Sequence, residues 1–149
     1  MVMMTFFSLN HSRFSPLPLI LNLFFSASCS KDEQNIVGKW QTTNYAWRAY
    51  DGDKLVQEGS ESCISWYLGF NFKSDGTGQE VYYTDEEVTT YQLTWVLMGD
   101  KLIVTSEDKE ATPYDVHELK RNSMALTMTS EDAYDEGKTI ITYTFKRVD

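Results

Sequence analysis

Cysteine is scarce in this sequence, which contains only Cys29 and Cys63. A framework of several disulfide bridges is therefore excluded, and a folded domain has to be held together by its hydrophobic core. Cys63 begins the apolar run Cys-Ile-Ser-Trp-Tyr-Leu, a setting typical of a buried and unreactive thiol. We therefore expect Cys63 to be a core residue without a chemical role.

Basic residues are also few, because 13 Lys and Arg stand against 22 Asp and Glu, and the net charge is −9. The longest basic clusters are the pairs Lys120-Arg121 and Lys146-Arg147. A surface of this charge repels the phosphate groups of nucleic acids. The composition thus predicts no nucleic-acid partner.

The common catalytic motifs are missing: the sequence has no Gly-x-Ser-x-Gly, His-Glu-x-x-His, Cys-x-x-Cys or phosphate-binding loop. Residues 76–78 read Gly-Thr-Gly without the third glycine of a dinucleotide fingerprint, which indicates a turn. His117 is interpreted as a half-exposed strand residue rather than a catalytic base or metal ligand. Asp132, Asp135 and Glu136 offer oxygens to Ca²⁺ but lack the one-three-five spacing of a calcium loop. We predict a protein that is not an enzyme and that has no cofactor and no metal.

Long hydrophobic runs are missing as well. Residues 14–25 form an apolar stretch that Pro16 and Pro18 interrupt, whereas a membrane-spanning helix needs about 20 apolar residues. Arg13 precedes this stretch, and residues 1–28 contain no acidic side chain. This combination is typical of an export signal. We predict that residues 1–28 are a signal peptide and take no part in the fold.

The remaining sequence shows the pattern of β-strands. Apolar residues recur at every second position within 91–98, 124–129 and 141–146, as expected of strands with one buried face. Asp, Asn and Gly between the runs favour tight turns, and turns about every 8 to 12 residues indicate a meandering sandwich or barrel. The predicted strands are residues 38–50, 54–60, 63–72, 77–84, 88–98, 101–106, 114–120, 124–130 and 138–148.

The segment Phe25-Ser26-Ala27-Ser28-Cys29 resembles a lipobox, in which small residues precede a cysteine that receives a lipid, although Ser stands where Leu is usual. The next residues, Ser30-Lys31-Asp32-Glu33, resemble the surface-export signal of Bacteroidetes lipoproteins. The resemblance implies lipid attachment at Cys29, the membrane as a partner, and a place on the bacterial outer membrane, at the cell surface or alternatively on the periplasmic face. The polar residues 29–35 are interpreted as a solvated tether.

Residues 36–149 resemble the short lipocalin-like domains of such lipoproteins. Residues 36–40, Ile-Val-Gly-Lys-Trp, are similar to the Gly-x-Trp opening of the first lipocalin strand, and residues 70–78, 91–105 and 143–148 are similar to later hairpins and to the closing strand. The resemblance implies a single antiparallel up-and-down β-barrel of about eight strands. It also implies that a basic residue near the chain end, Arg147 or Lys146, covers Trp40 through a cation–π contact. The chain departs from larger lipocalins because no C-terminal helix follows its last strand.

Two functions remain open on this evidence. In the first, inward aromatic and apolar side chains line a pocket for a small hydrophobic or amphipathic ligand, which is bound without catalysis. In the second, the barrel is packed solid and serves as an interaction module for a protein or glycan in a cell-envelope complex, through its acidic surface and a second aromatic group. The predicted ligand-lining residues are Trp40, Phe70, Phe72, Leu93, Trp95, Tyr143 and Phe145, and the second aromatic group is Tyr45, Trp47, Tyr50, Trp66 and Tyr67.

Overall fold

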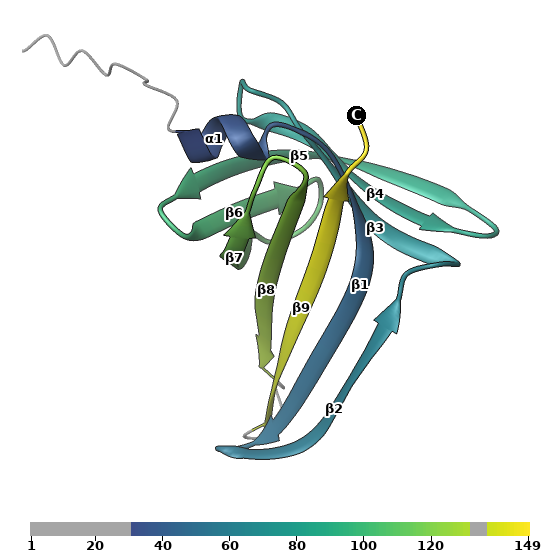
Figure 1. Cartoon of the computed structure of the whole chain (residues 1–149), viewed down its shortest axis with the longest axis vertical. Coiled ribbons are helices and arrows are strands. Elements are labelled where there is room, and N and C mark those ends of the chain that lie inside the picture. The colour runs from purple at the N-terminus through teal and green to yellow at the C-terminus, as the bar shows by residue number, and fades with distance from the viewer. Residues whose placement is uncertain (1–30, 132–136) are drawn as a thin grey trace, which may run out of the picture.

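The computed structural model describes residues 31–131 and 137–149, which form a short helix and an antiparallel sheet (Figure 1). The chain is all-β apart from this helix, as predicted, and the strand bounds lie within three residues of those expected from the sequence. The elements are α1 (Lys31–Ile36), β1 (Gly38–Asp51), β2 (Lys54–Ser62), β3 (Trp66–Phe72), β4 (Thr77–Thr84), β5 (Val88–Met98), β6 (Lys101–Ser106), β7 (Thr112–Leu119), β8 (Ser123–Glu131) and β9 (Gly137–Arg147).

The strands close into a barrel. From β3 to β9 each strand pairs antiparallel with the next one along the chain, and β9 returns to pair with β1 over almost its whole length. Both β2 and β3 also pair with β1. Strand β3 pairs with the first residues of β1, and β2 pairs with the last residues of β1. Because β2 and β3 act as one bent strand, the barrel has eight strands. The predicted up-and-down barrel is confirmed.

The bend between β2 and β3 interrupts the strand that was predicted to begin at residue 63. A bulge in β1 at Thr43 faces it, and the Cys63 N–H donates a hydrogen bond to the Thr43 carbonyl at 3.1 Å. Since a bulge bends its strand, the facing chain turns outward here and Ile64 is 88% exposed. Cys63 is half-buried, so its predicted full burial is wrong. This partial burial raises the pKa of the Cys63 thiol, and the negative charge of Glu61 raises it further.

Inward side chains fill one continuous core. Along β5, Leu93, Trp95 and Leu97 are buried while the residues between them are exposed, which confirms the predicted alternation. Burial of one large apolar side chain stabilises the fold by about 1.5–3 kcal/mol, so this face fixes the register of the sheet. The core consists of Ile36, Trp40, Leu68, Phe70, Phe72, Leu93, Trp95, Leu97, Leu102, Val104, Tyr114, Met124, Leu126 and Phe145.

Helix α1 covers one end of the barrel (Figure 1). Asp32 and Glu33 lie in its first turn, where acidic side chains interact favourably with the helix dipole. Its last residue, Ile36, is fully buried in the barrel core. Residues 31–35 fall within the predicted tether, and the structure shows that they are helical rather than irregular. None of the residues that the structure describes forms a helix with the length and hydrophobicity that crossing a membrane requires.

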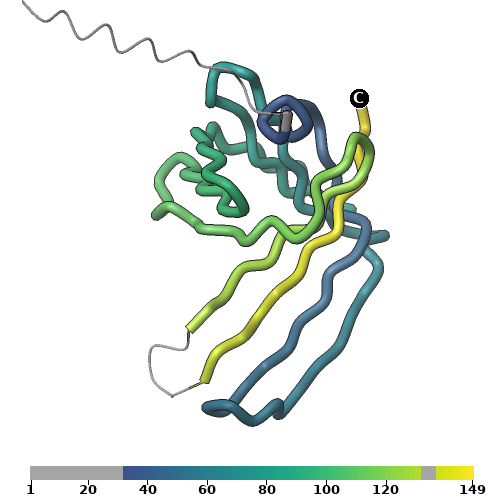
Figure 2. The backbone as a smooth tube through the Cα atoms, turned by 60° about the vertical axis from the view of Figure 1, so that its left-hand side comes forward, coloured from purple at the N-terminus to yellow at the C-terminus, as the bar shows by residue number. Residues whose placement is uncertain are grey.

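The two ends of the barrel differ. The end beneath α1 also carries the turns after β3, β5 and β7, and it is called the closed end below. At the opposite, open end, β8, β9, β1 and β2 extend beyond the other strands as a separate wall (Figures 1 and 2). The turns after β1, β4 and β6 surround this open end.

Candidate functional site

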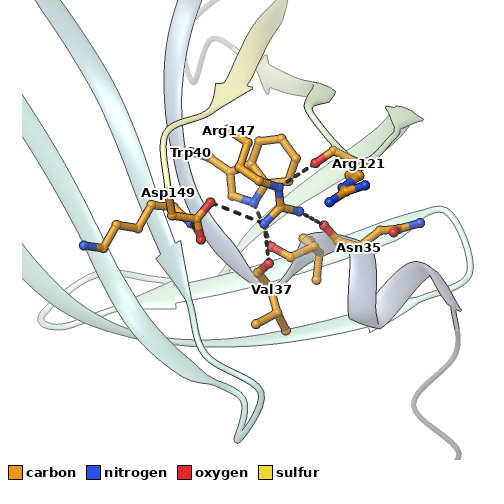
Figure 3. A network of polar contacts seen from close by, with 8 residues as sticks. Asn35, Val37, Trp40, Arg121, Arg147 and Asp149 are labelled. Carbon is orange, nitrogen blue, oxygen red and sulfur yellow. Dashed lines mark hydrogen bonds and ion pairs between the residues drawn. The ribbon is translucent and has the colours of Figure 1, made fainter.

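Arg147 lies over Trp40 at the closed end (Figure 3). The guanidinium carbon is 4.4 Å from the centroid of the Trp40 ring, which confirms the predicted cation–π contact for Arg147. Lys146, the other candidate, is exposed on the opposite side of β9. The indole Nε1 of Trp40 donates a hydrogen bond to the Ile36 carbonyl at 2.7 Å. A cation–π contact of this kind stabilises by about 0.5–2 kcal/mol, and the hydrogen bond from Trp40 to Ile36 joins the end of α1 to the barrel.

The same guanidinium donates to three backbone carbonyls. Its Nε donates to Arg121 at 2.5 Å, its Nη1 to Val37 at 2.6 Å, and its Nη2 to Asn35 (Figure 3). The Asp149 carboxylate lies 3.6 Å from Nη1. Arg147 thus connects β9 to the end of α1 and to the turn between β7 and β8. These contacts shut the closed end.

Above this closure, six of the seven predicted ligand-lining residues are packed against one another. The Phe70 ring lies 5.0 Å from that of Phe72 and 5.6 Å from that of Phe145, and the Phe72 ring lies 5.6 Å from that of Trp95. The indole of Trp95 donates to the Lys73 carbonyl at 3.0 Å. All six side chains belong to the buried core: Trp40, Phe70, Phe72, Leu93, Trp95 and Phe145. They form the floor beneath the open end.

A cavity of about 180 Å³ lies inside the barrel above this floor and opens at the open end; we call it the open-end cavity. Tyr143, the seventh predicted residue, lines it. Binding sites for drug-sized ligands enclose about 300–1,000 Å³, whereas an apolar cavity of about 150 Å³ holds benzene. The volume therefore suits a group about as large as one aromatic ring. The lining residues are Trp66, Leu68, Glu80, Tyr82, Val104, Ser106, Lys109, Glu110, Thr112, Tyr114, Met128 and Tyr143.

A buried carboxylate, that of Glu80, faces the cavity from β4, and its side chain is only 7% exposed. Its Oε1 accepts a hydrogen bond from the Tyr82 hydroxyl at 2.7 Å. Its Oε2 accepts from the Ser106 hydroxyl at 2.5 Å and from the Lys109 ammonium at 3.1 Å. A buried charge is tolerated only when it is paired and hydrogen-bonded, and the three donors satisfy this requirement.

Lys109 reaches Glu80 from the turn after β6. Asp108, with φ of 61°, and a hydrogen bond from the Lys109 N–H to the Ser106 carbonyl shape this turn. The ammonium lies 4.7 Å from the ring centroid of Tyr82 and 4.2 Å from that of Tyr91. Two aromatic rings and one carboxylate thus surround the ammonium at the mouth of the cavity.

Three tyrosines around the cavity keep their hydroxyl protons at neutral pH. Burial raises the pKa of Tyr143 to about 12 and also raises the pKa of Tyr114 well above its usual range. For Tyr82, burial again raises the pKa, and the hydrogen bond to Glu80 raises it further. The three hydroxyls are therefore neutral, and that of Tyr82 donates to Glu80.

The second predicted aromatic group is divided. Tyr45 lies beside the cavity, with its ring 5.8 Å from that of Trp66 and 5.7 Å from that of Tyr143, and Trp47 follows at 5.3 Å from Tyr45. In contrast, Tyr67 stacks on Tyr83 at 4.8 Å, and Tyr50 lies below the Lys138 ammonium at 5.4 Å. The five side chains thus do not form one contact patch. Of these five, Trp66 lines the open-end cavity, and the rings of Tyr45 and Trp47 follow it in a row.

Other depressions of the surface are larger. One of about 540 Å³ crosses β1, β2 and β9 and includes Ala46, Arg48 and Glu58, whose ion pair with Arg48 is exposed to solvent. It lies on the face of β1 opposite Tyr45. We regard the smaller cavity as the candidate site because it alone, of the depressions named here, lies inside the barrel.

Several predicted positions do not contribute to this site. His117 is exposed at a register shift in β7, in agreement with its interpretation as a strand residue at least partly open to solvent. Residues 1–30, with Cys29, and residues 132–136, with the weak calcium candidates Asp132, Asp135 and Glu136, lie outside the residues that the structure describes.

The polar cluster was not predicted from the sequence. Strand alternation places Glu80 on the same face as Tyr82 and Gly78, and the register of β5 and β6 sets Ser106 against Leu93. An acidic residue at an inward position was therefore a detectable signal. No local pattern predicts the contact between Lys109 and Glu80, because the two residues lie 29 positions apart in the sequence.

An eight-stranded up-and-down barrel that opens with Gly-x-Trp and is closed by an arginine over that tryptophan has lipocalin architecture. The model of the lipocalin-like domain family matches residues 36–126, more than half of the chain, and the protein belongs to this family. Lipocalin folds generally bind small hydrophobic ligands.

Several solved structures are similar to this chain. A lipocalin-like protein from Bacteroides uniformis is 19% identical, with a TM-score of 0.49, and the match covers 76% of this chain and 99% of that one. A protein from Bacteroides eggerthii is 16% identical, with a TM-score of 0.49, covering 75% and 98%. The bovine lipocalin allergen Bos d 2 is 15% identical, with a TM-score of 0.46, covering 77% and 74%. Among curated proteins, none matches the sequence.

Proposed function

We propose that the barrel binds a small hydrophobic or amphipathic molecule in the open-end cavity and does not catalyse a reaction. The observation that carries this proposal is the composition of the cavity wall, in which Trp66, Leu68 and Met128 face the buried Glu80 cluster. Apolar walls with a few placed polar groups are characteristic of small-ligand sites. The apolar part of the ligand would lie against these side chains and its polar group beside Glu80.

A cavity-filling variant tests the proposal. Met128 lines the cavity from a half-buried position, whereas Val96 is exposed on the outside of β5. We expect calorimetric titration with 2-phenylethanol, a neutral one-ring probe, to show saturable binding to the wild type and to Val96→Trp. Binding should be lost in Met128→Trp. If the wild type binds no one-ring probe, or if Met128→Trp binds as well as Val96→Trp, the proposal is wrong.

The size of the cavity favours a second candidate function. At about 180 Å³ it is smaller than most ligand sites, and the aromatic floor beneath it is packed. A barrel of this kind can serve as an interaction module for a protein or glycan in a cell-envelope complex. Crosslinking on intact cells would then recover a partner in stoichiometric amount, and no apolar probe would bind the purified domain.

We further propose that a lipid on Cys29 anchors the domain to the bacterial outer membrane, at the cell surface. The lipobox-like residues 25–29 and the Ser-Lys-Asp-Glu sequence that follows them support this location. Stable anchoring takes two or more acyl chains, since one chain binds only marginally. Cys29→Ala should lose acyl labelling and leave the membrane fraction, whereas Cys63→Ala should keep both. A Cys29→Ala protein that stays in the membrane fraction would refute the anchor.

A further inference from the structure

We infer that the ligand of the open-end cavity is a primary amine with one apolar group about as large as an aromatic ring, and that Lys109 occupies the place of its ammonium group in the free protein. This inference rests on the proposed ligand-binding function. Its first support is the carboxylate of Glu80, which faces the cavity with its side chain 7% exposed. A carboxylate so deeply placed is stabilised by a cationic partner whether the cavity is empty or filled.

The second support is the aromatic surround of that cationic position. The Lys109 ammonium contacts the rings of Tyr82 and Tyr91, and Trp66 and Tyr143 also line the cavity. Aromatic faces attract ammonium groups most strongly where water is excluded. The mouth of the cavity thus has the two elements of an ammonium site, a carboxylate and aromatic faces.

The third support is the unequal burial of the two charges. The Lys109 side chain is 40% exposed and carries a flexible stem, and among the described residues its ammonium contacts side chains only. It can therefore rotate into solvent, where the ammonium is well hydrated. Glu80 cannot leave the barrel interior. A ligand amine that enters would restore the ion pair, and its N–H groups would donate to Oε2 as Lys109 does.

Charge also selects against an anionic ligand. The charged residues in the cavity wall are Glu80, Lys109 and Glu110, so the wall carries a net negative charge even when Lys109 is in place. A carboxylate ligand would meet two carboxylates there. The cavity volume limits the apolar part to about one ring, because a cavity of about 150 Å³ holds benzene.

The test compares three probes of the same size: phenethylamine, 2-phenylethanol and 3-phenylpropionate, titrated calorimetrically at neutral pH. We expect phenethylamine to bind at least about tenfold more tightly than the alcohol, the size of one charge-assisted hydrogen bond, and the carboxylate to bind most weakly. In Glu80→Gln this preference for the amine should disappear while binding of the alcohol remains. Retained alcohol binding shows that the variant is folded.

Lys109→Ala gives the sharpest result, because it should strengthen the binding of the amine. Removal of the internal competitor should raise phenethylamine affinity about twofold to fivefold, the range expected for release of a partly exposed ion pair. The matched control is Lys101→Ala, which removes an exposed lysine paired with Asp115 at the closed end of the barrel and should change nothing. An unchanged or weaker affinity in Lys109→Ala overturns the inference.

The two proposals fail in different ways. If 2-phenylethanol binds but phenethylamine binds no more tightly, the ligand site stands and the amine inference is wrong. If Glu80→Gln keeps the preference for the amine, the carboxylate does not select the ligand and the inference is again wrong. If none of the three probes binds, the ligand-binding function itself is refuted.

Discussion

At both ends of the barrel a cation lies over aromatic rings, and the comparison of Arg147 with Lys109 shows that these two are held differently. At the closed end, Arg147 lies over Trp40, donates to three backbone carbonyls and is 17% exposed. At the open end, Lys109 lies over Tyr82 and Tyr91, is 40% exposed and is bound by side chains alone. Backbone partners cannot move without unfolding, whereas side-chain partners can be exchanged. The comparison separates a structural closure from a site that is able to open.

The largest expected difference in the free energy of unfolding is between a variant in the packed floor and a variant in the cavity wall. Phe72 is 1% exposed within the floor, so Phe72→Ala should lower the free energy of unfolding by about 3–5 kcal/mol. Met128 already borders a cavity, so Met128→Ala should cost only about 1 kcal/mol. Urea denaturation followed by near-ultraviolet circular dichroism measures both. Equal losses would mean that the two ends are packed alike.

The two cations themselves give the next largest difference. Arg147→Ala leaves three carbonyls without their donor and removes the ring contact, which should lower the free energy of unfolding by about 3 kcal/mol. Lys109→Ala should cost less than about 1 kcal/mol, the value of a partly exposed pair. Lys146→Ala, next to Arg147 but exposed, serves as the control. If Lys109→Ala were as destabilising as Arg147→Ala, Lys109 would be a structural closure too.

Two glycines test whether the backbone is also more tightly packed near the closed end than at the open end. A Cβ on Gly78 would lie 2.2 Å from the Asn71 carbonyl oxygen, which the β3–β4 pairing holds in place. A Cβ on Gly59 would lie 2.3 Å from the ring of Trp47, a half-buried side chain on the extension at the open end. Gly78→Ala should therefore cost about 2 kcal/mol, and Gly59→Ala less than about 1 kcal/mol because the ring can rotate away. Thermal unfolding of the two variants would contradict this ranking if Gly59→Ala melted first.

The sequence was most informative where one face of a strand is uniformly apolar. The alternation in β5 located Leu93, Trp95 and Leu97, and the turn residues Gly52, Gly76 and Gly99 have the positive φ that such turns require. The architecture and the Arg147 contact followed from the family resemblance. These features depend on local patterns or on positions near the Gly-x-Trp segment.

The candidate site was less accessible to sequence reasoning. β4 reads Thr-Gly-Gln-Glu-Val-Tyr-Tyr-Thr, and its inward face combines a glycine, a carboxylate and a tyrosine, so no apolar stripe marks its orientation. The partners of Glu80 come from β6 and from the following turn, which only the tertiary fold brings near. Helix α1 was missed because six residues are too few for an apolar period. The six floor residues were correctly placed inside the barrel, but whether they meet a ligand stays a prediction.

The smallest expected effect is on the pH dependence of stability, and it again distinguishes the two ends of the barrel. The core aromatics near the closed end are Trp and Phe, whereas Tyr82, Tyr114 and Tyr143 surround the cavity. Burial raises the pKa of all three tyrosines, to about 12 for Tyr143, whereas an unfolded tyrosine titrates near pH 10. The folded state thus binds these protons more tightly. Their contribution to stability is complete below about pH 10 and is lost as the pH rises toward 12.

Urea denaturation between pH 9 and 11 should accordingly show a falling free energy of unfolding, with a shallower slope in Tyr143→Phe. Tyrosine absorbance at 295 nm should show a class of hydroxyls that ionises only as the protein unfolds. Val96→Ala is the control, since Val96 is exposed on the outside of β5 and has no titratable group, so it should leave the slope unchanged. A slope that is equal in the wild type and in Tyr143→Phe would show that the hydroxyl in the cavity is as open to water in the folded state as in the unfolded one.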